Sequence, residues 1–279
     1  MTRRRFLRTA AACVGGLGCG LGLYAWRWEP HWLSVAHQPL ALKGLPASWV
    51  GARIVQLSDL HIGPVVSDAY LRSCFDRVQA MRPDVVVYTG DFTTYDANVI
   101  THARAMFPHL PTGARATFGV LGNHDYGLGY SMSRIADQLA GLASDAGVTM
   151  LRNACAEVDG LQFFGLDDLW AGRFNPVAAL AGYDASRDGV ALSHNPDTAD
   201  RAGWDGFQGW ILAGHTHGGQ CRPPFFSPPL LPVQNRRYTQ GVFELTPQRN
   251  MYINPGLGYL QRIRFGIRPE ATVFHLEAA

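Results

Sequence analysis

The sequence predicts a domain of the α/β class, and three observations support this prediction. Segments 52–61 and 84–91 are apolar runs with polar ends, and they flank an amphipathic stretch at 68–81, which gives the order strand, helix, strand. The same apolar-then-polar pattern recurs further along the chain. Several runs end in Asp, His or Asn, and open α/β sheets place their ligand sites at such carboxyl ends of strands. With 279 residues, 47% of them hydrophobic, the chain is expected to form one large domain or at most two, with an ample core.

The N-terminal 30 residues differ in composition from the rest of the chain. An uncharged run rich in Ala, Gly and Leu covers residues 9–26, which exceeds the about 17 residues needed to cross a bilayer. Four arginines precede it: Arg3, Arg4, Arg5 and Arg8. The arrangement resembles a twin-arginine signal. We predict that residues 1–30 are a twin-arginine-like signal peptide or membrane anchor. The alternative is a buried helix at the start of a cytosolic domain.

The charges around this segment predict its orientation. Only Arg27 closely follows the run, so the positive-inside rule places the N-terminus in the cytoplasm and the body on the extracytoplasmic (periplasmic) side. Trp26, Trp28 and Trp32 follow as interfacial aromatic residues do. No clean A-x-A site precedes the body, which favours an uncleaved or slowly cleaved anchor. The expected partners of this segment are the membrane and, for export of the folded chain, the Tat translocase.

The remaining elements follow along the body of the chain. Residues 31–50 contain Pro39 and Pro46 and are expected to be a linker with room for one edge strand, so that the folded domain spans 51–279. A helix is expected at 132–143. Further strands are expected in 116–125, near Met150, Ala156 and Leu161, in 189–197, in 209–217, and in the tail 242–276.

The net charge and the cysteine spacing argue against a nucleic-acid partner, a disulfide framework and a CxxC zinc site. The formal net charge is +2, and part of the positive charge is the N-terminal arginine cluster, so no nucleic-acid partner is expected. The five cysteines lie at positions 13, 19, 74, 155 and 221. Their spacing gives neither a disulfide framework nor a CxxC zinc pattern.

Polar residues gather at the ends of the expected strands. They are Asp59, His61, Asp91, Asn123, His124, Asp125, His194, His215 and His217. Each has an ordinary structural explanation when taken alone, as a turn, a helix cap or a solvated strand end. In an extended chain, His215 and His217 share one face, and the neighbouring glycines allow close approach. Together, these carboxylates and imidazoles predict a metal site.

The order of these residues resembles the calcineurin-like metallophosphoesterase superfamily. The resemblance runs from D-x-H through GD, GNHD and a lone His to GHTH, and covers about residues 50–276. The stretch GHTHGGQ is most similar to the exported or membrane-associated bacterial branch, which includes phosphodiesterases. The resemblance implies a four-layer α/β/β/α sandwich of two mixed sheets, the metallo-dependent phosphatase fold, with a dinuclear site across the strand ends.

The same resemblance implies a set of ligands for two divalent metal ions. Asp59, His61 and His217 are assigned to one ion, Asn123, His194 and His215 to the other, and Asp91 to a bridging position. In dinuclear sites the ions lie about 3.5–4 Å apart and clamp a phosphoryl oxygen. Mixed nitrogen and oxygen ligands suit Mn, Fe or Zn.

Three further residues are expected to take part in the reaction, two of them in catalysis and one in substrate binding. By the resemblance, a metal-bridging hydroxide attacks phosphorus and His124 protonates the leaving oxygen. Asp125 is expected to fix the tautomer of His124 and raise its basicity. Arg264 is a weaker candidate for a phosphate contact, and its alternative is a solvated or ion-paired surface arginine.

The sequence therefore predicts a dinuclear-metal-dependent phosphoester hydrolase. The leading hypothesis is a phosphodiesterase acting on an envelope or lipid-linked substrate. One alternative is an enzyme like the UDP-2,3-diacylglucosamine pyrophosphatases of lipid A synthesis, whose substrate is cytoplasmic. A less favoured alternative is a non-enzymatic, metal-bound interaction module.

One apolar segment follows the last metal-site motif. The stretch PPFFSPPLLP, residues 223–232, reads as a rigid loop rich in proline. Its large side chains are Phe225, Phe226, Leu230 and Leu231. We expect them either to lie in a membrane interface or to pack as part of the core.

Overall fold

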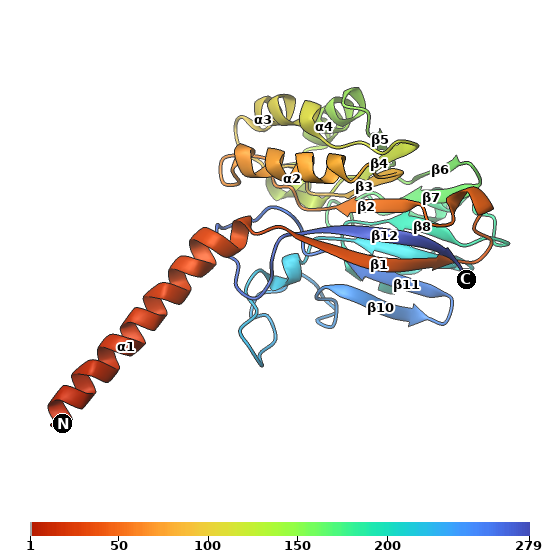
Figure 1. The fold of residues 1–279 in the computed structure, drawn as a ribbon. Helices are drawn as coiled ribbons and strands as arrows, with labels where there is room; N and C mark the ends of the chain where they lie inside the picture. The colour runs from red at the N-terminus through yellow and green to blue at the C-terminus, as the bar shows by residue number, and fades with distance from the viewer. Residues whose placement is uncertain (1) are drawn as a thin grey trace.

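Two six-stranded mixed sheets pack face to face in the structure, a computed structural model that describes residues 2–279 (Figure 1). In spatial order, the first sheet contains β1 (Ser34–Leu42), β12 (Glu270–Ala278), β2 (Arg53–Leu57), β3 (Val85–Thr89), β4 (Ala116–Val120) and β5 (Thr149–Met150). The second contains β10 (Gly241–Thr246), β11 (Arg249–Ile253), β9 (Gly209–Ala213), β8 (Gly189–Leu192), β7 (Leu161–Gly165) and β6 (Ala154–Val158). This arrangement confirms the predicted α/β class.

The central strands of both sheets are parallel and buried on both faces. β2, β3, β4 and β5 pair in parallel, as do β7, β8, β9 and β11. Every residue of β3 is buried, which explains its continuous apolar sequence VVVYT. Ile54 and Val87 of the first sheet and Phe163 and Leu212 of the second belong to the core between the sheets. The parallel strands therefore end together at one edge of the sandwich.

Three helices cover the outer face of the first sheet (Figure 1). They are α2 (Asp68–Ala80), α3 (Val99–Met106) and α4 (Ser133–Asp145). The hydroxyl of Ser67 caps α2 by accepting a hydrogen bond from the backbone N–H of Tyr70. The buried residues Leu71, Phe75 and Val78 recur every three or four positions, so one face of α2 packs on the sheet.

Fewer and shorter helices cover the outer face of the second sheet than cover that of the first. The short helix α5 (Pro176–Ala179), a 3-10 segment at Pro196–Asp200 and the connecting loops lie over the second sheet. Trp204 and Phe207 belong to this outer core. The fourth layer of the sandwich therefore consists largely of loops.

Most predicted elements of the body match the structure, and one boundary differs. The strand, helix, strand prediction corresponds to β2, α2 and β3, and the helix expected at 132–143 is α4. The short helix α3 was not predicted. The edge strand expected within residues 31–50 is β1, which pairs in parallel with β12 over nine residues at the edge of the first sheet. The folded unit therefore begins about 17 residues before Gly51.

The N-terminal segment forms a helix that stands away from the sandwich (Figure 1). α1 (Arg3–Leu23) continues through a π-helical turn at Tyr24–Trp28 and a 3-10 turn at Glu29–His31. The whole helical segment of 29 residues is long and apolar enough to cross a membrane. None of its most apolar window is buried, which excludes the alternative of a core helix at the start of the domain.

Candidate metal centre

The polar residues that follow five parallel strands meet at one edge of the sandwich. β2, β3 and β4 lead into the Asp59–His61, Asp91 and Asn123–His124 segments, and β8 and β9 lead into His194 and the His215–His217 segment. Six of these side chains form two groups of three, and within each group the candidate ligand atoms lie within 4.8 Å of one another. The structure therefore brings the sequence-predicted residues together, across both sheets.

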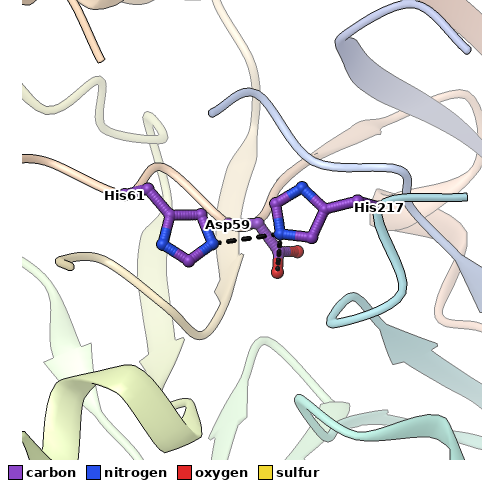
Figure 2. A group of neighbouring side chains, drawn as sticks. All are labelled: Asp59, His61 and His217. Carbon is purple, nitrogen blue, oxygen red and sulfur yellow. Dashed lines mark hydrogen bonds and ion pairs between the residues drawn. The ribbon is translucent and has the colours of Figure 1, made fainter. Parts of the chain in front are cut away.

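The first group is Asp59, His61 and His217 (Figure 2). Nε2 of His217 lies 3.0 Å from Nε2 of His61 and 3.3 Å from Oδ1 of Asp59. The outer nitrogen of His61, Nδ1, lies 2.8 Å from the hydroxyl oxygen of Thr94. That hydrogen bond orients the ring so that Nε2 faces the other two ligand candidates.

The second group is Asp91, His194 and His215. Nε2 of His194 lies 3.2 Å from Oδ2 of Asp91 and 3.1 Å from Nδ1 of His215. The outer nitrogens face backbone carbonyl oxygens: Nδ1 of His194 lies 2.7 Å from that of Thr89, and Nε2 of His215 lies 2.8 Å from that of Pro232. A carbonyl oxygen cannot donate a hydrogen bond, so the ring nitrogen that faces it must be the N–H donor, which leaves the inner nitrogens for a metal or a proton.

Asp91 joins the two groups. Its Oδ2 lies 3.2 Å from Nε2 of His194 and 3.8 Å from Nε2 of His61, one histidine from each group. Its other oxygen, Oδ1, accepts a hydrogen bond of 2.9 Å from the backbone N–H of His124. This hydrogen bond fixes the carboxylate between the groups.

Burial and neighbouring charges set the protonation of the site. Burial lowers the pKa of His61 and His215 to about 3 and that of His217 well below its usual value, so these imidazoles are neutral near pH 7. Burial also lowers the pKa of His194, but the adjacent Asp91 carboxylate, together with Asp59 and Asp168, outweighs burial and raises the pKa to about 10. For Asp91, burial raises the pKa, but His194 and other nearby histidines hold it well below its usual value. The His194–Asp91 pair thus holds a proton that a metal ion would displace.

Backbone strain is concentrated at the site. The positive φ angles of site residues lie between 49° and 71° at Asp59, His61, Asp91, His215 and His217. Such left-handed conformations cost about 1–3 kcal/mol each in residues other than glycine and persist where the surrounding structure enforces them. These residues lie just beyond the strand ends, where the left-handed backbone turns their side chains into the site.

Glycine is required at position 214, beside the histidine pair, because a side chain would not fit there. A Cβ atom at Gly214 would overlap the hydroxyl of Ser58 and the carboxylate of Asp59. The Asp59 carboxylate instead accepts hydrogen bonds from the backbone N–H of His215, at 3.1 and 3.0 Å to its two oxygens. The end of β9 therefore lies close enough to the end of β2 to bring the two groups of ligand candidates together.

The residues present fit two metal ions. The ligand candidates are buried imidazoles and carboxylates, a donor set that suits Mn, Fe or Zn. Asn123 adds an independent observation, because its side chain is buried and neither its oxygen nor its nitrogen has a hydrogen-bond partner among the described residues. An unpaired buried amide is unusual in folded proteins, and a carbonyl oxygen is a suitable ligand for a divalent ion.

His124 lies beside the two groups without belonging to either. Its ring packs edge-on against His61 at 5.2 Å between centroids and against Tyr130 at 5.6 Å. The residue is only partly buried, unlike the ligand candidates. Its ring is therefore accessible to a substrate that approaches the centre.

The expected role of Asp125 requires a correction. Its carboxylate accepts hydrogen bonds from the backbone N–H groups of Phe92, Thr93 and Gly122 and from the Thr93 hydroxyl, at 3.0–3.2 Å. Within residues 2–279, no hydrogen bond joins the side chains of Asp125 and His124. Asp125 ties the loop after β3 to the loop after β4, so it supports the site and does not orient His124.

Arg264 lies in the interior, next to the first group. It is fully buried, and the carbonyl oxygens of Pro255, Gly256 and Gly258 lie 2.9, 3.1 and 2.6 Å from its Nη2 and share the two N–H groups of that atom. The same atom lies 3.4 Å from Nδ1 of His217. The alternative that Arg264 is a solvated or ion-paired surface residue is therefore wrong. Its Nη2 instead contacts backbone carbonyl oxygens.

Two aromatic residues that the sequence did not single out border the site. The Trp170 ring packs perpendicular to His215 with centroids 4.5 Å apart, and Tyr130 lies 5.7 Å from Trp170. With the His124–Tyr130 contact, these rings form a continuous arc from His124 to His215. Trp170 lies in a turn and Tyr130 at the end of a three-residue 3-10 segment, where no periodic pattern marks them.

Asp168 is a buried carboxylate at the same edge. It follows β7, and burial raises its pKa to about 6 although the nearby His194 opposes that shift. One of its oxygens accepts a hydrogen bond of 2.7 Å from the backbone N–H of Ala171, and the other has no partner among the described residues. Asp167 beside it instead binds Arg152 and Tyr126.

Comparisons with known proteins agree with this geometry. The family model described as calcineurin-like phosphoesterase matches residues 52–219. The chain is 32% identical to the uncharacterized metallophosphoesterase YkuE of Bacillus subtilis, covering 100% of this chain and 98% of that protein. It is 30% identical to phosphodiesterase YaeI of Escherichia coli, covering 99% of each. It is 29% identical to the UDP-2,3-diacylglucosamine pyrophosphatase LpxG of Chlamydia trachomatis, covering 88% and 91%.

Proposed function

Since the chain belongs to the calcineurin-like phosphoesterase family and is a metal-dependent phosphohydrolase, we propose that it hydrolyses a phosphodiester, in an envelope or lipid-linked substrate. The observation that carries this proposal is the pair of buried ligand groups that share Oδ2 of Asp91. The similarity to phosphodiesterase YaeI over nearly the whole chain supports the choice of a diester.

The proposal assigns each ligand candidate to one of two ions. Asp59, His61 and His217 would hold one, Asn123, His194 and His215 the other, and Asp91 would contact both. When bound, two such ions polarise the phosphoryl oxygens and lower the pKa of water, which supplies the nucleophile at neutral pH. Mn, Fe and Zn all suit this donor set.

The chain's own residues then position the substrate and move a proton. His124 is the group we assign to protonate the leaving oxygen, because its ring packs against His61 and the residue is partly exposed. Its backbone N–H is held on Asp91, so the ring keeps a fixed position relative to the centre. Tyr130 and Trp170 form the wall against which the leaving group would rest.

Arg264 and Asp125 act in this account as positioning residues. Arg264 holds the carbonyls of the 255–258 turn and faces the outer nitrogen of His217. Asp125 holds the loops that carry Asp91 and His124. A direct phosphate contact by Arg264 is not part of the proposal, because the residue is fully buried and three backbone carbonyls contact its Nη2.

A second candidate function is hydrolysis of a pyrophosphate in a UDP-linked acylated glucosamine. The 29% identity to the LpxG pyrophosphatase of Chlamydia trachomatis favours it. The membrane side of the body separates the two candidates, because that substrate is cytoplasmic. We propose that α1 anchors the body on the periplasmic side through the Tat route. Exchange of Arg3 and Arg4 for lysine should then keep the chain in the cytoplasm, and unchanged export would contradict this route.

The experiment that tests the proposed function compares two soluble esters. The full chain in mild detergent, loaded separately with Mn, Fe and Zn, is assayed on bis-p-nitrophenyl phosphate and on p-nitrophenyl phosphate. The proposal expects metal-dependent cleavage that prefers the diester and is abolished in Asp91→Ala. A preference for the monoester would overturn the phosphodiesterase assignment. Silence on both esters with both metals bound would favour the pyrophosphatase candidate or a non-enzymatic, metal-bound module.

A further inference from the structure

The loop between β9 and β10 exposes large apolar side chains to solvent. Phe225 is fully exposed, and Phe226 and Leu230 are 71% and 79% exposed, whereas Leu231 is buried. The expectation that all four pack in the core is therefore wrong for three of them. Exposed aromatic and aliphatic side chains gathered in one loop are typical of an interaction site.

Both ends of this loop are fixed to the metal centre. The backbone N–H of Gln220 donates to the carbonyl of His217 at 2.9 Å, at the start of the loop. At its end, the carbonyl of Pro232 lies 2.8 Å from Nε2 of His215. The loop that carries the exposed apolar side chains therefore begins and ends at contacts with candidate metal ligands.

The same loop is connected to the base of α1. The side chain of Gln220 donates hydrogen bonds to the carbonyls of Gln261 and Ile263 at 3.2 and 2.9 Å. The backbone N–H of Arg264 in turn donates to the carbonyl of Ala25 at 2.9 Å, where α1 ends. In Figure 1 the light-blue loop before β10 and the dark-blue loop before β12 both lie near the base of α1. Segments 24–32, 220–232 and 257–268 therefore form one continuous part of the molecule.

These three segments present apolar residues together with positive charge. We define the docking surface by Trp26, Trp28, Phe225, Phe226, Leu230 and Ile263, all exposed. Arg262 stacks over Trp26 at 5.3 Å, and Arg268 stacks over Trp32 at 4.2 Å. Arg27 and Arg222 are exposed, and the one carboxylate in the three segments, Glu29, is buried.

We propose that the docking surface lies in the headgroup region of the same bilayer that α1 enters, so that the metal centre opens beside the membrane. Tryptophan at the end of a spanning helix and loop phenylalanines suit the bilayer interface. Arginines without exposed carboxylates suit anionic phospholipid headgroups. The same arginines disfavour a second copy of this chain as the occupant, because the two surfaces would bring like charges together.

The consequence concerns the class of substrate and rests on the proposed function. A metal centre at the rim of a membrane-embedded surface can take a phosphodiester whose apolar chains stay in the leaflet. Phe225 and Phe226 would then contact those chains or their neighbours, while the phosphate reaches the ligand groups.

The test measures the position of the loop without using turnover. The full chain carries serine in place of Cys13, Cys19, Cys155 and Cys221, and a spin label is attached at Phe226→Cys or, as a matched control, at Val177→Cys. Val177 lies on α5 and is 72% exposed, as Phe226 is 71% exposed, so neither change threatens folding. Both proteins are reconstituted in vesicles of phosphatidylcholine and phosphatidylglycerol.

The proposal expects the label at position 226 to collide several-fold less often with a water-soluble nickel complex than the label at 177, and at least as often with oxygen. Equal nickel accessibility at the two positions would overturn the proposal. Dipolar broadening that disappears on dilution with unlabelled chain would identify a second copy as the occupant and would also overturn it. Neither of these outcomes bears on whether the chain is a phosphohydrolase, because the measurement does not use turnover.

A second measurement separates the docking surface from the proposed function. Phe225→Asp with Phe226→Asp should reduce cleavage of a phosphodiester lipid in vesicles several-fold relative to cleavage of bis-p-nitrophenyl phosphate, and Val177→Asp should leave that ratio unchanged. An unchanged ratio in the double variant would contradict the docking surface. If neither ester is cleaved by the unsubstituted chain, the proposed function fails, and the label accessibilities still decide the surface.

Discussion

Oδ2 of Asp91 lies 3.2 Å from Nε2 of His194, in a buried pair at the junction of two groups of candidate metal ligands. The same oxygen faces His61 of the other group at 3.8 Å. No other side-chain oxygen of the described residues has an ion-pair contact to histidines of both groups. Removal of this carboxylate should therefore affect both ions, whereas loss of a histidine should affect mainly one.

Asp91→Asn should lower the metal content from two ions per chain to one or fewer and reduce turnover at least about 100-fold, because an amide cannot supply the shared negative charge. Elemental analysis of the purified full chain, together with diester hydrolysis, measures both effects. Asp205→Asn, at an exposed position, is the control and should change neither. Two tightly bound ions in Asp91→Asn would contradict the bridging assignment.

His124→Ala should reduce turnover by about 10²–10⁴-fold and leave the metal content unchanged, because the ring borders the ligand groups without belonging to them. The loss should be smaller for a p-nitrophenol leaving group, which needs little protonation, than for an alkyl alcohol. Steady-state kinetics on a series of diesters checks this dependence. Simultaneous loss of activity and metal would show that His124 has no separate role.

Metal binding at the second group should depend on pH. The pKa of His194 in the metal-free protein is about 10, so its inner nitrogen carries a proton at pH 7 that an ion must displace. The apparent affinity should therefore increase as pH rises towards 10, by up to about tenfold per unit for one released proton. Calorimetry at pH 8 in buffers of different protonation enthalpy counts the protons released. A pH-independent affinity between pH 7 and 9 would be inconsistent with this protonation state.

Arg264→Met should destabilise the fold and weaken the first metal group. The substitution leaves the buried carbonyls of Pro255 and Gly258 without their donor, whereas that of Gly256 keeps the backbone N–H of Glu270. The cost is about 1–3 kcal/mol for each unsatisfied group, and the support beside His217 is lost as well. We expect a lower midpoint of thermal unfolding and metal affinity reduced about tenfold, with little change in KM. A raised KM with unchanged thermal stability would instead identify Arg264 as a phosphate contact.

The sequence predicts which polar side chains lie together, because these residues directly follow the strand ends. Asp59, Asp91, His194 and His215 each follow an apolar run, and parallel strands bring such positions to one edge. The direction of a side chain after the strand end is not local. The contacts of Asp125 lie on the loop after β3, about 33 residues earlier, so its neighbour His124 gave a misleading indication.

Long-range pairing explains the other differences. The edge strand expected in residues 31–50 pairs, as β1, with β12 at the opposite end of the chain, and its own sequence does not indicate that partner. Arg264 lies in a loop whose sequence resembles a surface segment, and it is buried because the carbonyls of the 255–258 turn converge on it. Trp170 and Tyr130 reach the site from loops without periodicity.

The most direct test of the dinuclear centre is a crystal structure of the Mn-loaded chain with anomalous scattering data collected at the manganese edge. The account predicts two anomalous peaks about 3.5–4 Å apart, one beside each ligand group, with Asp91 contacting both. A single peak, or two peaks that do not share Asp91, would contradict it.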